Sequence, residues 1–350
     1  MLSGVATGGG GAGSGGASVD LPDFGDVVDA HDRLRGHVAR TPVLGSPRFD
    51  ERVGRRVVFK CENLQHAGAF KFRGASNALL QLEAARATAS GAGAGARVVA
   101  THSSGNHGAA LARAAAAIGW RCIVVVPHDA NPVKTAAICA AGAELVTCEP
   151  GLAPRETALA EVVARTGAEV VHPFDDSRVI AGQGTAAMEL LADHPELDVL
   201  TAPVGGGGLL AGSALAVRGM LPSCRVVGAE PEVADDAARS FHGGVRVGMP
   251  GSPPTIADGL RGSIGVRPYA LFRRHVDDVV TVSERAIVEA MRIALEDLRL
   301  LVEPSSAVPL AALLAGRIGA PGQRIGVIVS GGNVDLSVCP FLAGDPTPSH

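Results

Sequence analysis

Short apolar runs rich in β-branched residues alternate with Ala- and Leu-rich stretches of helical spacing from residue 57 onward, and this alternation constrains the fold more than any other feature. Seven of the runs are predicted to be strands, at residues 57–61, 97–101, 122–126, 144–147, 199–204, 226–229 and 325–329. Several are apolar on both faces, which is typical of parallel strands that helices cover on both sides. The sequence therefore predicts an α/β fold.

Two breaks in this pattern predict where the chain crosses between domains. One is the Gly-rich stretch at residues 90–96, and the other lies around residues 172–176. We expect a small α/β domain at 96–173, inserted into a large domain that is made of residues 21–95 and 174–350.

Composition and charge exclude several classes of protein. The 31 Lys and Arg against 35 Asp and Glu leave a net charge of −4, so no basic excess is available to hold nucleic acid. No run approaches the roughly 18 apolar residues of a membrane-spanning helix. The first charged side chain is Asp20, so we expect no secretory signal. Residues 1–20 carry few large side chains, which predicts a disordered tail.

Cysteine usage indicates a reducing, cytoplasmic location. The six cysteines are scattered through apolar segments without a C-x-x-C pair, which predicts reduced and mostly buried thiols. They are Cys61, Cys122, Cys139, Cys148, Cys224 and Cys339.

The stretch at residues 68–75, Gly-Ala-Phe-Lys-Phe-Arg-Gly-Ala, is the most specific signal for chemistry. One interpretation of Lys71 is a surface residue whose stem lies along apolar neighbours, and the motif alone favours it. The other is a desolvated amine, because apolar surroundings lower the pKa of a lysine and free it to form a Schiff base.

Four consecutive glycines follow a predicted strand and, with Leu209, open a helix: Gly205, Gly206, Gly207 and Gly208. Their backbone N–H groups can converge on an anion at the helix N-terminus, which predicts a phosphate site. An ordinary strand-to-helix turn needs one or two glycines and gains nothing from four. A dinucleotide site would require G-x-G-x-x-G in the first βαβ unit, so it is the weaker interpretation.

Two further motifs follow predicted strands. Residues 101–108, Thr-His-Ser-Ser-Gly-Asn-His-Gly, precede an Ala-rich helix. A helix cap needs only one Ser or Asn, whereas several hydroxyl and amide groups at a helix N-terminus suit a substrate carboxylate. The second motif, Ser-Gly-Gly-Asn at 330–333, is by itself only a turn.

Taken in this order, the lysine motif, the Ser/Asn loop, the tetraglycine loop and the final Ser-Gly-Gly-Asn resemble the fold type II pyridoxal-phosphate enzymes, and most closely serine racemase and the serine/threonine dehydratases. The resemblance extends from about Ala30 to about Ser337 and includes Glu303-Pro304. It implies two doubly wound sheet domains with the cofactor in the cleft between them, the large domain binding the cofactor. It also implies a homodimer that acts on a small amino-acid substrate.

Carried over residue by residue, the resemblance implies that Lys71 forms a Schiff base with pyridoxal 5'-phosphate and is catalytic. The other cofactor-binding residues would be Phe70, Asn106, Gly205, Gly206, Gly207, Gly208, Leu209, Glu303 and Ser330. The substrate would be held by Ser103, Ser104, Gly105, Asn106 and His107. Asn106 would face the ring hydroxyl, and Glu303 would lie near the ring.

Two serines determine which reactions the resemblance implies. Ser330 would hydrogen-bond the pyridine nitrogen, and a hydroxyl cannot hold that nitrogen protonated as a carboxylate would. The cofactor would then be a weaker electron sink, which favours rapid expulsion of the β-hydroxyl of serine or threonine. Ser104 would be a second catalytic residue across the cofactor from Lys71, and two proton-transfer faces permit racemisation.

The segment at 230–236 resembles the divalent-cation site of the family. It would hold Mg²⁺ or Ca²⁺ through Glu230, the carbonyl of Ala234 and Asp236, since hard cations prefer oxygen ligands. An acidic loop followed by a helix cap explains the same residues without a metal.

The chain departs from the family pattern in ways that bear on regulation. His66-Ala67 stands where nucleotide-activated serine racemases have Lys-Thr, and Pro47 and Arg48 replace a Ser and an apolar residue. The resemblance therefore does not extend to activation by ATP. Ala69 replaces the usual Ser before Phe-Lys.

We therefore expect a cytoplasmic dehydratase that converts L-serine or L-threonine to the 2-oxo acid and ammonia, with serine racemisation as a second activity. One alternative is a 3-hydroxyaspartate dehydratase, in which Arg155 near the cleft would favour an acidic substrate. A solvated helix residue is the favoured interpretation of Arg155. Another alternative is a non-catalytic relative that binds pyridoxal phosphate or an amino acid for regulation.

Overall fold

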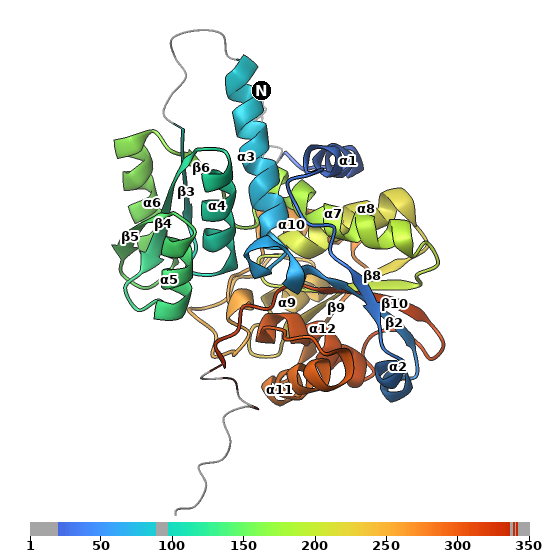
Figure 1. Ribbon diagram of the computed structural model, residues 1–350. Coiled ribbons are helices and arrows are strands. Elements are labelled where there is room, and N and C mark those ends of the chain that lie inside the picture. Colours follow the sequence, from blue (N-terminus) through green and yellow to red (C-terminus); the bar gives the residue numbers. More distant parts are fainter. Residues whose placement is uncertain (1–19, 89–96, 337–338, 340, 342–350) are drawn as a thin grey trace, which may run out of the picture.

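The computed structural model describes residues 20–88, 97–336, 339 and 341. The predicted tail, up to residue 19, and the Gly-rich break at 90–96 lie outside these residues. Two sheets form two units, with the four-stranded unit on the left of Figure 1 and the six-stranded unit on the right. Within the described part of the chain, every helix is too short or too polar to span a bilayer.

The larger sheet has the order β1-β2-β10-β7-β8-β9. Its strands are β1 (Val43–Gly45), β2 (Arg56–Cys61), β7 (Val199–Pro203), β8 (Arg225–Pro231), β9 (Asp278–Val282) and β10 (Arg324–Val329). Only β1 is antiparallel to its neighbour, and the other pairs are parallel. The carboxyl ends of the five parallel strands therefore lie at one edge of the sheet.

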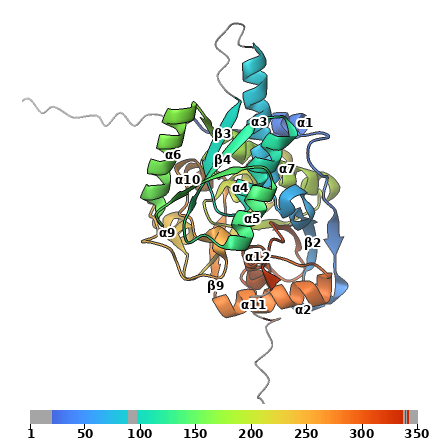
Figure 2. The ribbon, with the colours of Figure 1, turned by 60° about the vertical axis from the view of Figure 1, so that its left-hand side comes forward.

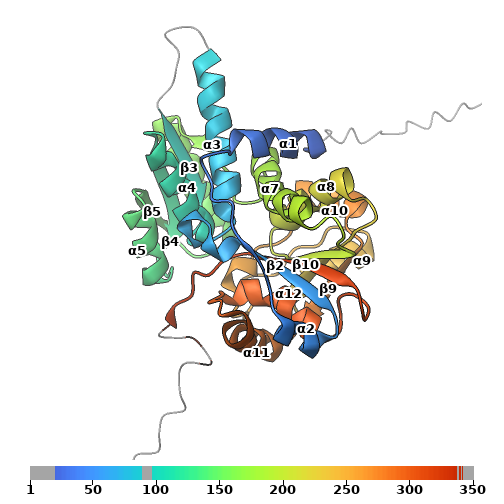
Figure 3. The same cartoon turned by 45° about the vertical axis from the view of Figure 1, so that its right-hand side comes forward.

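Helices cover both faces of this sheet, as Figure 3 shows. On one face are α2 (Pro47–Val53), α11 (Glu284–Ile293) and α12 (Pro304–Leu314). On the other are α1 (Phe24–Arg33), α7 (Ser177–Asp193), α8 (Gly208–Met220), α9 (Asp236–Gly243) and α10 (Val266–His275). Each face buries its own apolar cluster, so the strands are apolar on both sides.

The smaller sheet is parallel throughout and has the order β5-β4-β3-β6. Its strands are β3 (Val98–His102), β4 (Arg121–Pro127), β5 (Glu144–Cys148) and β6 (Glu169–Val170). Helices α4 (Asn106–Ala117) and α5 (Pro132–Ala140) cover one face and α6 (Leu152–Thr166) covers the other (Figure 2). Successive β4 residues alternate between these faces, since Val124 packs toward α4 and Ile123 and Val125 pack toward α6.

Helix α3 (Lys71–Thr88) packs against α7 of the larger unit and α4 of the smaller one. Short helical turns complete the chain at Glu62–Leu64, His66–Gly68, Asp258–Leu260 and Ala294–Leu298. The predicted α/β class and all seven predicted strands are confirmed. Four of the six cysteines are buried, as expected, while Cys148 is half-buried and Cys139 is exposed.

Three strands escaped prediction. Strands β1 and β6 have three and two residues, which is too short for a pattern to be recognised. Strand β9 is at the edge of its sheet, and only two of its five residues are buried. Its sequence, Asp-Val-Val-Thr-Val, contains polar residues and does not show the continuous apolar run by which the other strands were recognised.

Candidate active site

The lysine motif lies along the end of β10. The backbone N–H of Phe70 donates to the carbonyl of Ser330 at 2.9 Å, and Ala69 forms an antiparallel bridge with Gly331. Helix α3 begins at the next residue, Lys71. Two motifs that are about 260 residues apart in the sequence are thus in direct contact, at the carboxyl edge of the larger sheet.

The amine of Lys71 is partly buried against a backbone carbonyl and an aromatic ring. Its Nζ donates to the carbonyl of Pro173 at 2.7 Å and lies 5.0 Å from the centre of the Phe70 ring. Burial lowers the pKa of this amine from 10.5 to about 8, while the negative charge of Glu303 acts in the opposite direction. A much larger fraction of Lys71 is therefore neutral and nucleophilic near neutral pH than of an ordinary lysine.

Glu303 is a buried carboxyl group at the start of α12, and two amides control its surroundings. Asn106 Nδ2 lies 2.9 Å from each oxygen of Glu303, and Asn106 Oδ1 accepts from Asn333 Nδ2 at 2.9 Å. Burial raises the pKa of Glu303 to about 7, against the hydrogen bond from Asn106 and the nearby charges of Lys134 and Lys71.

Ser330 ends β10 with a buried, uncharged hydrogen-bonding group. Its Oγ lies 3.0 Å from Ser306 Oγ, which in turn accepts the N–H of Gly331 at 2.7 Å. A hydroxyl pair of this kind can donate to a ring nitrogen, but it carries no charge that would hold a proton there.

The predicted substrate loop connects β3 to α4. Ser103 Oγ accepts the N–H of Gly105 at 3.4 Å, and Ser104 is half-buried in the bend between them. The His107 ring is buried and donates to the carbonyl of Val171 at 3.2 Å, so only its backbone N–H faces the N-terminus of α4. The first N–H groups of a helix have no intrahelical partner and attract anions. This loop can therefore receive a carboxylate through backbone groups.

The four glycines connect β7 to α8, next to the end of β10. A Cβ atom on Gly206 would come within 2.2 Å of the Phe174 ring, and one on Gly205 within 2.9 Å of Leu260 Cα. Gly207 has φ +85°. The idea that a turn gains nothing from four glycines is therefore wrong here, because packing also requires them. The loop still places the free N–H groups of α8 at this edge.

A turn at residues 172–175, here called the His172 turn, lies between Lys71 and the tetraglycine loop and contacts both. Its Pro173 carbonyl accepts from Lys71, and its Phe174 ring covers Gly206. The sequence pattern predicted only a break between domains at this stretch. The available signal was a His-Pro-Phe-Asp run directly after apolar residues, which carries more polar and aromatic groups than a simple crossing needs.

The predicted metal ligands lie apart from this site, between β8 and α9. Glu230 accepts the N–H groups of Ala237 at 3.3 Å and Ala238 at 2.8 Å, and Asp236 Oδ2 accepts the N–H of Ile264 at 2.7 Å. Asp236 Oδ1 is buried without a hydrogen-bond partner among the described residues.

Burial makes both of these carboxyl groups easier to protonate. It raises the pKa of Asp236 to about 6 and that of Glu230 well above its usual range, with Asp236 as a further cause for Glu230. Among the described residues, no three His, Cys, Asp or Glu side chains are placed to hold a metal. The predicted ligand set has two carboxylates and one carbonyl.

Arg155 lies on α6 and is half-buried. Its Nε is shielded from solvent and has no hydrogen-bond partner among the residues that the structure describes. Its positive charge helps burial to lower the pKa of His102, at the end of β3. The interpretation of Arg155 as a fully solvated residue is therefore corrected.

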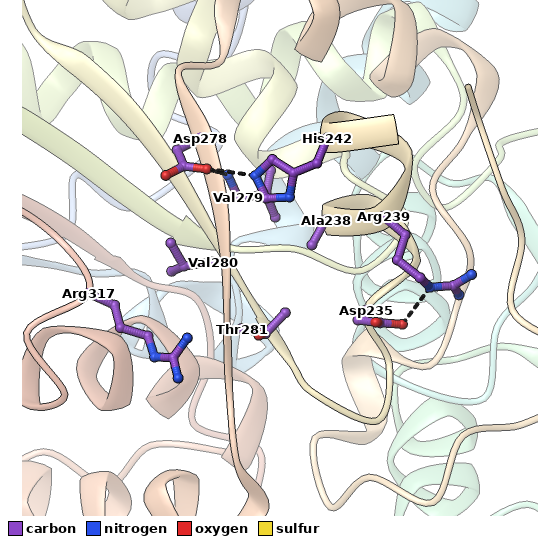
Figure 4. A pocket seen from close by; sticks show the side chains of 9 residues that line it. All are labelled: Asp235, Ala238, Arg239, His242, Asp278, Val279, Val280, Thr281 and Arg317. Atoms are coloured by element: carbon purple, nitrogen blue, oxygen red, sulfur yellow. Dashed lines mark hydrogen bonds and ion pairs between the residues drawn. The ribbon is translucent and has the colours of Figure 1, made fainter. Parts of the chain in front are cut away.

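A hollow of about 840 Å³ borders the site and is lined by Gly105 and Asn106 on one side and by Gly68 and Asn333 on the other. A second pocket, of about 590 Å³, lies between α9 and β9 (Figure 4). His242 of α9 pairs with Asp278 of β9, and Arg239 pairs with Asp235 four residues before it. None of the predicted cofactor or substrate residues lines the second pocket, so the candidate site lies at the larger hollow.

Residues 34–331 match the family described as pyridoxal-phosphate dependent enzyme. The chain is 44% identical over 321 residues to the beta-hydroxyaspartate dehydratase of Paracoccus denitrificans (strain Pd 1222), covering 92% of this chain and 99% of the relative. It is 44% identical over 319 residues to a serine racemase of Arabidopsis thaliana, covering 90% and 94%. The structure of maize serine racemase matches with a TM-score of 0.86 at 40% identity, covering 91% and 96%.

The pKa of Lys71 can be measured directly, because the chain has only three lysines, Lys60, Lys71 and Lys134. After reductive methylation with ¹³C-formaldehyde, we expect the Lys71 signal in cofactor-free protein to titrate with a midpoint near pH 8, because burial favours its neutral form. Lys71→Arg identifies the signal by its disappearance, and Lys134→Arg serves as the control. A midpoint near 10.5 would contradict the buried position of this amine.

Proposed function

Because this chain belongs to the pyridoxal-phosphate-dependent enzyme family, we propose that it is a dehydratase that converts L-serine or L-threonine to the 2-oxo acid and ammonia, and that it racemises serine as a second activity. One observation carries the proposal: the lysine motif contacts Ser330 through Phe70, and the Lys71 amine, whose pKa is lowered, is under the influence of Glu303, which Asn106 contacts. A relative that bound only an amino acid would have no use for that amine, whereas ammonia release distinguishes the enzyme from a relative that only binds the cofactor.

The residues at this edge fit pyridoxal phosphate. Lys71 offers a desolvated amine for covalent attachment, and the loop from Gly205 to Gly208 leaves no side chain between the N–H groups of α8 and an anion. Ser330 offers a neutral hydroxyl for the ring nitrogen, and Asn106 offers an amide for the ring hydroxyl. When bound, the cofactor supplies the electron sink that makes the α-proton of an amino acid acidic.

The chain's own residues perform the remaining tasks. The neutral amine of Lys71 takes the α-proton on its face of the substrate, and its pKa near 8 suits an exchange of protons near neutral pH. The N–H groups at the start of α4 bind the substrate carboxylate, together with the hydroxyls of Ser103 and Ser104. Ser104 can return a proton on the opposite face, which converts one enantiomer of serine to the other.

A second candidate substrate is 3-hydroxyaspartate, and Arg155 is the observation that favours it. A guanidinium whose buried Nε–H has no hydrogen-bond partner among the described residues matches a substrate that brings a second carboxylate. A relative with 44% identity is named a beta-hydroxyaspartate dehydratase, which supports the same substrate class. The β-hydroxyl leaves from this substrate as it does from serine.

We also propose that Glu230, the carbonyl of Ala234 and Asp236 hold Mg²⁺ or Ca²⁺. Asp236 Oδ1, which is buried and has no hydrogen-bond partner among the described residues, fits a hard cation, because two buried carboxylates that repel each other are costly. The homodimeric state, the cytoplasmic location and the domain boundaries at 96–173 and at 21–95 with 174–350 remain proposals. The four-stranded sheet, which spans residues 98–170, supports the boundaries of the small domain.

Ammonia release from L-serine, L-threonine and the 3-hydroxyaspartate isomers tests the proposed function. We expect a yellow protein that dehydrates at least one of them, and no turnover by Lys71→Ala. Arg155→Ala should lower kcat/KM for 3-hydroxyaspartate by about tenfold or more, and leave that for L-serine within about threefold, because only the former has a second carboxylate. A protein that binds no added pyridoxal phosphate refutes the function, and an unchanged substrate ranking refutes the role of Arg155.

Ser104→Ala separates the two activities. Racemisation needs a proton donor on the face opposite Lys71, whereas elimination needs a base on the Lys71 face only. The variant should therefore lose far more of its L-serine racemisation than of its dehydration, and with D-serine it should lose both. Chiral chromatography of serine and an assay of pyruvate measure the two rates. Equal losses from L-serine would leave Ser104 with carboxylate binding as its only role.

Titration of metal-free protein with Mg²⁺ or Ca²⁺ tests the metal site. An ion that binds only the folded state stabilises it, by about 2.7 kcal/mol at a hundred times Kd, so the melting temperature should rise. Asp236→Asn should abolish the rise, whereas Asp235→Asn, next to it but paired with Arg239, should keep it. An unchanged melting temperature with both ions would remove the site.

A further inference from the structure

The His172 turn is held by the imidazole of His172 itself. Its Nδ1 accepts the N–H of Asp175 at 2.9 Å and that of Phe174 at 3.4 Å. An atom that accepts two N–H groups carries no proton, so the ring is neutral and its proton is on Nε2. Burial, with His102 as a further cause, lowers the pKa of His172 to about 4, which keeps the ring neutral near pH 7.

The backbone of the turn contacts two groups at the candidate site. The carbonyl of Pro173 is the acceptor for Lys71 Nζ at 2.7 Å. The Phe174 ring fills the space in which Gly206 has no side chain. Consecutive residues of one turn therefore set the direction of the Lys71 amine and the position of the tetraglycine loop.

The turn is also fixed to a helix of the larger unit. Asp175 accepts the N–H groups of Val266 at 2.9 Å and Arg267 at 3.0 Å, in the first turn of α10. The N–H of Asp175 donates to His172, and the carboxylate of Asp175 accepts from α10. Loss of the His172 acceptor would therefore affect both the turn and its attachment to α10.

The ring of His172 makes a separate set of contacts. It lies edge-on to the rings of His102, with centroids 5.3 Å apart, and Phe174, with centroids 4.7 Å apart. His102 is the last residue of β3 and leads directly into Ser103 and Ser104. The acceptor of His172 thus serves Lys71 and the tetraglycine loop, whereas its ring packs against the strand that carries the substrate loop.

We propose that His172 is a positioning residue whose Nδ1 acceptor holds the amine of Lys71 and the tetraglycine loop in register, while its ring supports the loop at 103–107. This inference rests on the proposed function, because it concerns how the cofactor and substrate residues are placed. His172 need not touch either molecule, since it acts through Pro173 and Phe174.

Two substitutions separate the effect of the Nδ1 acceptor from that of the ring. His172→Phe keeps a ring between His102 and Phe174 but has no acceptor. His172→Asn keeps an acceptor, because an Asn oxygen can accept from N–H groups two and three residues ahead, but it has no ring. His172→Leu, which also lacks the acceptor, replaces His172→Phe if the larger ring prevents folding. His128→Phe, at an exposed histidine paired with Glu149, is the control.

The measurements are the Kd for pyridoxal phosphate, from its absorbance, and kcat and KM for ammonia release from L-serine at saturating cofactor. His172→Phe should weaken cofactor binding by about tenfold and lower kcat at least as much, because it leaves a buried N–H unpaired. Its KM should stay within about threefold. His172→Asn should keep Kd and kcat within about threefold and raise KM, because the substrate loop loses its packing partner.

Opposite patterns in the two variants support the proposal. The same losses in both would assign the effect to ring packing alone and overturn it, and so would wild-type values in His172→Phe. Failure of the proposed function is distinguishable: a wild-type protein that binds pyridoxal phosphate but releases no ammonia from any substrate refutes the activity, while the Kd values still decide the role of Nδ1. A wild-type protein that binds no pyridoxal phosphate refutes both.

Discussion

Arg73 is the central member of a cluster of four charged side chains that are almost completely shielded from solvent. It donates to both oxygens of Glu62 and to Glu189, and Lys60 Nζ donates to Glu189 at 2.6 Å. Removing such charges from water costs several kcal/mol per ion unless each is paired, so the cluster tolerates few arrangements. It joins β2 and α7 to α3 two residues after Lys71. The direction in which the lysine motif enters the site follows from that pairing.

With the start of α3 fixed, the carboxyl edge of the larger sheet determines what surrounds Lys71. Strands β10 and β7 are parallel neighbours. Ser330 follows β10 and the tetraglycine loop follows β7, so these groups lie at the same edge of the sheet. The smaller unit also contributes polar contacts near this edge. Asn106 reaches Glu303, and Lys134 on α5 forms an ion pair with Asp258.

Sequence periodicity was sufficient to predict the elements but not the contacts across them. Buried parallel strands were recognised because both of their faces are apolar, whereas β9, at a sheet edge, was missed. Lys71 and Ser330 were singled out as site residues only because several motifs, taken in order, resemble a known family. The Pro173 carbonyl could not be found in this way, because it is 102 residues from Lys71 and a backbone acceptor has no residue type. The reason for four glycines was also hidden, since it depends on Phe174 and Leu260, which are distant in the sequence.

Lys71 and Glu303 show how one cause moves two opposite charges toward neutrality. Burial lowers the pKa of the amine to about 8 and raises that of the carboxyl group to about 7, because it penalises the charged form of each. Their mutual attraction opposes both shifts. Near neutral pH, both groups therefore carry less charge than an exposed lysine and an exposed glutamate would. Asn333 fixes the amide of Asn106 so that its Nδ2 faces Glu303, and this donor favours the charged carboxylate. The protonation of Lys71 is thus sensitive to an amide orientation that is set on the far side of Glu303.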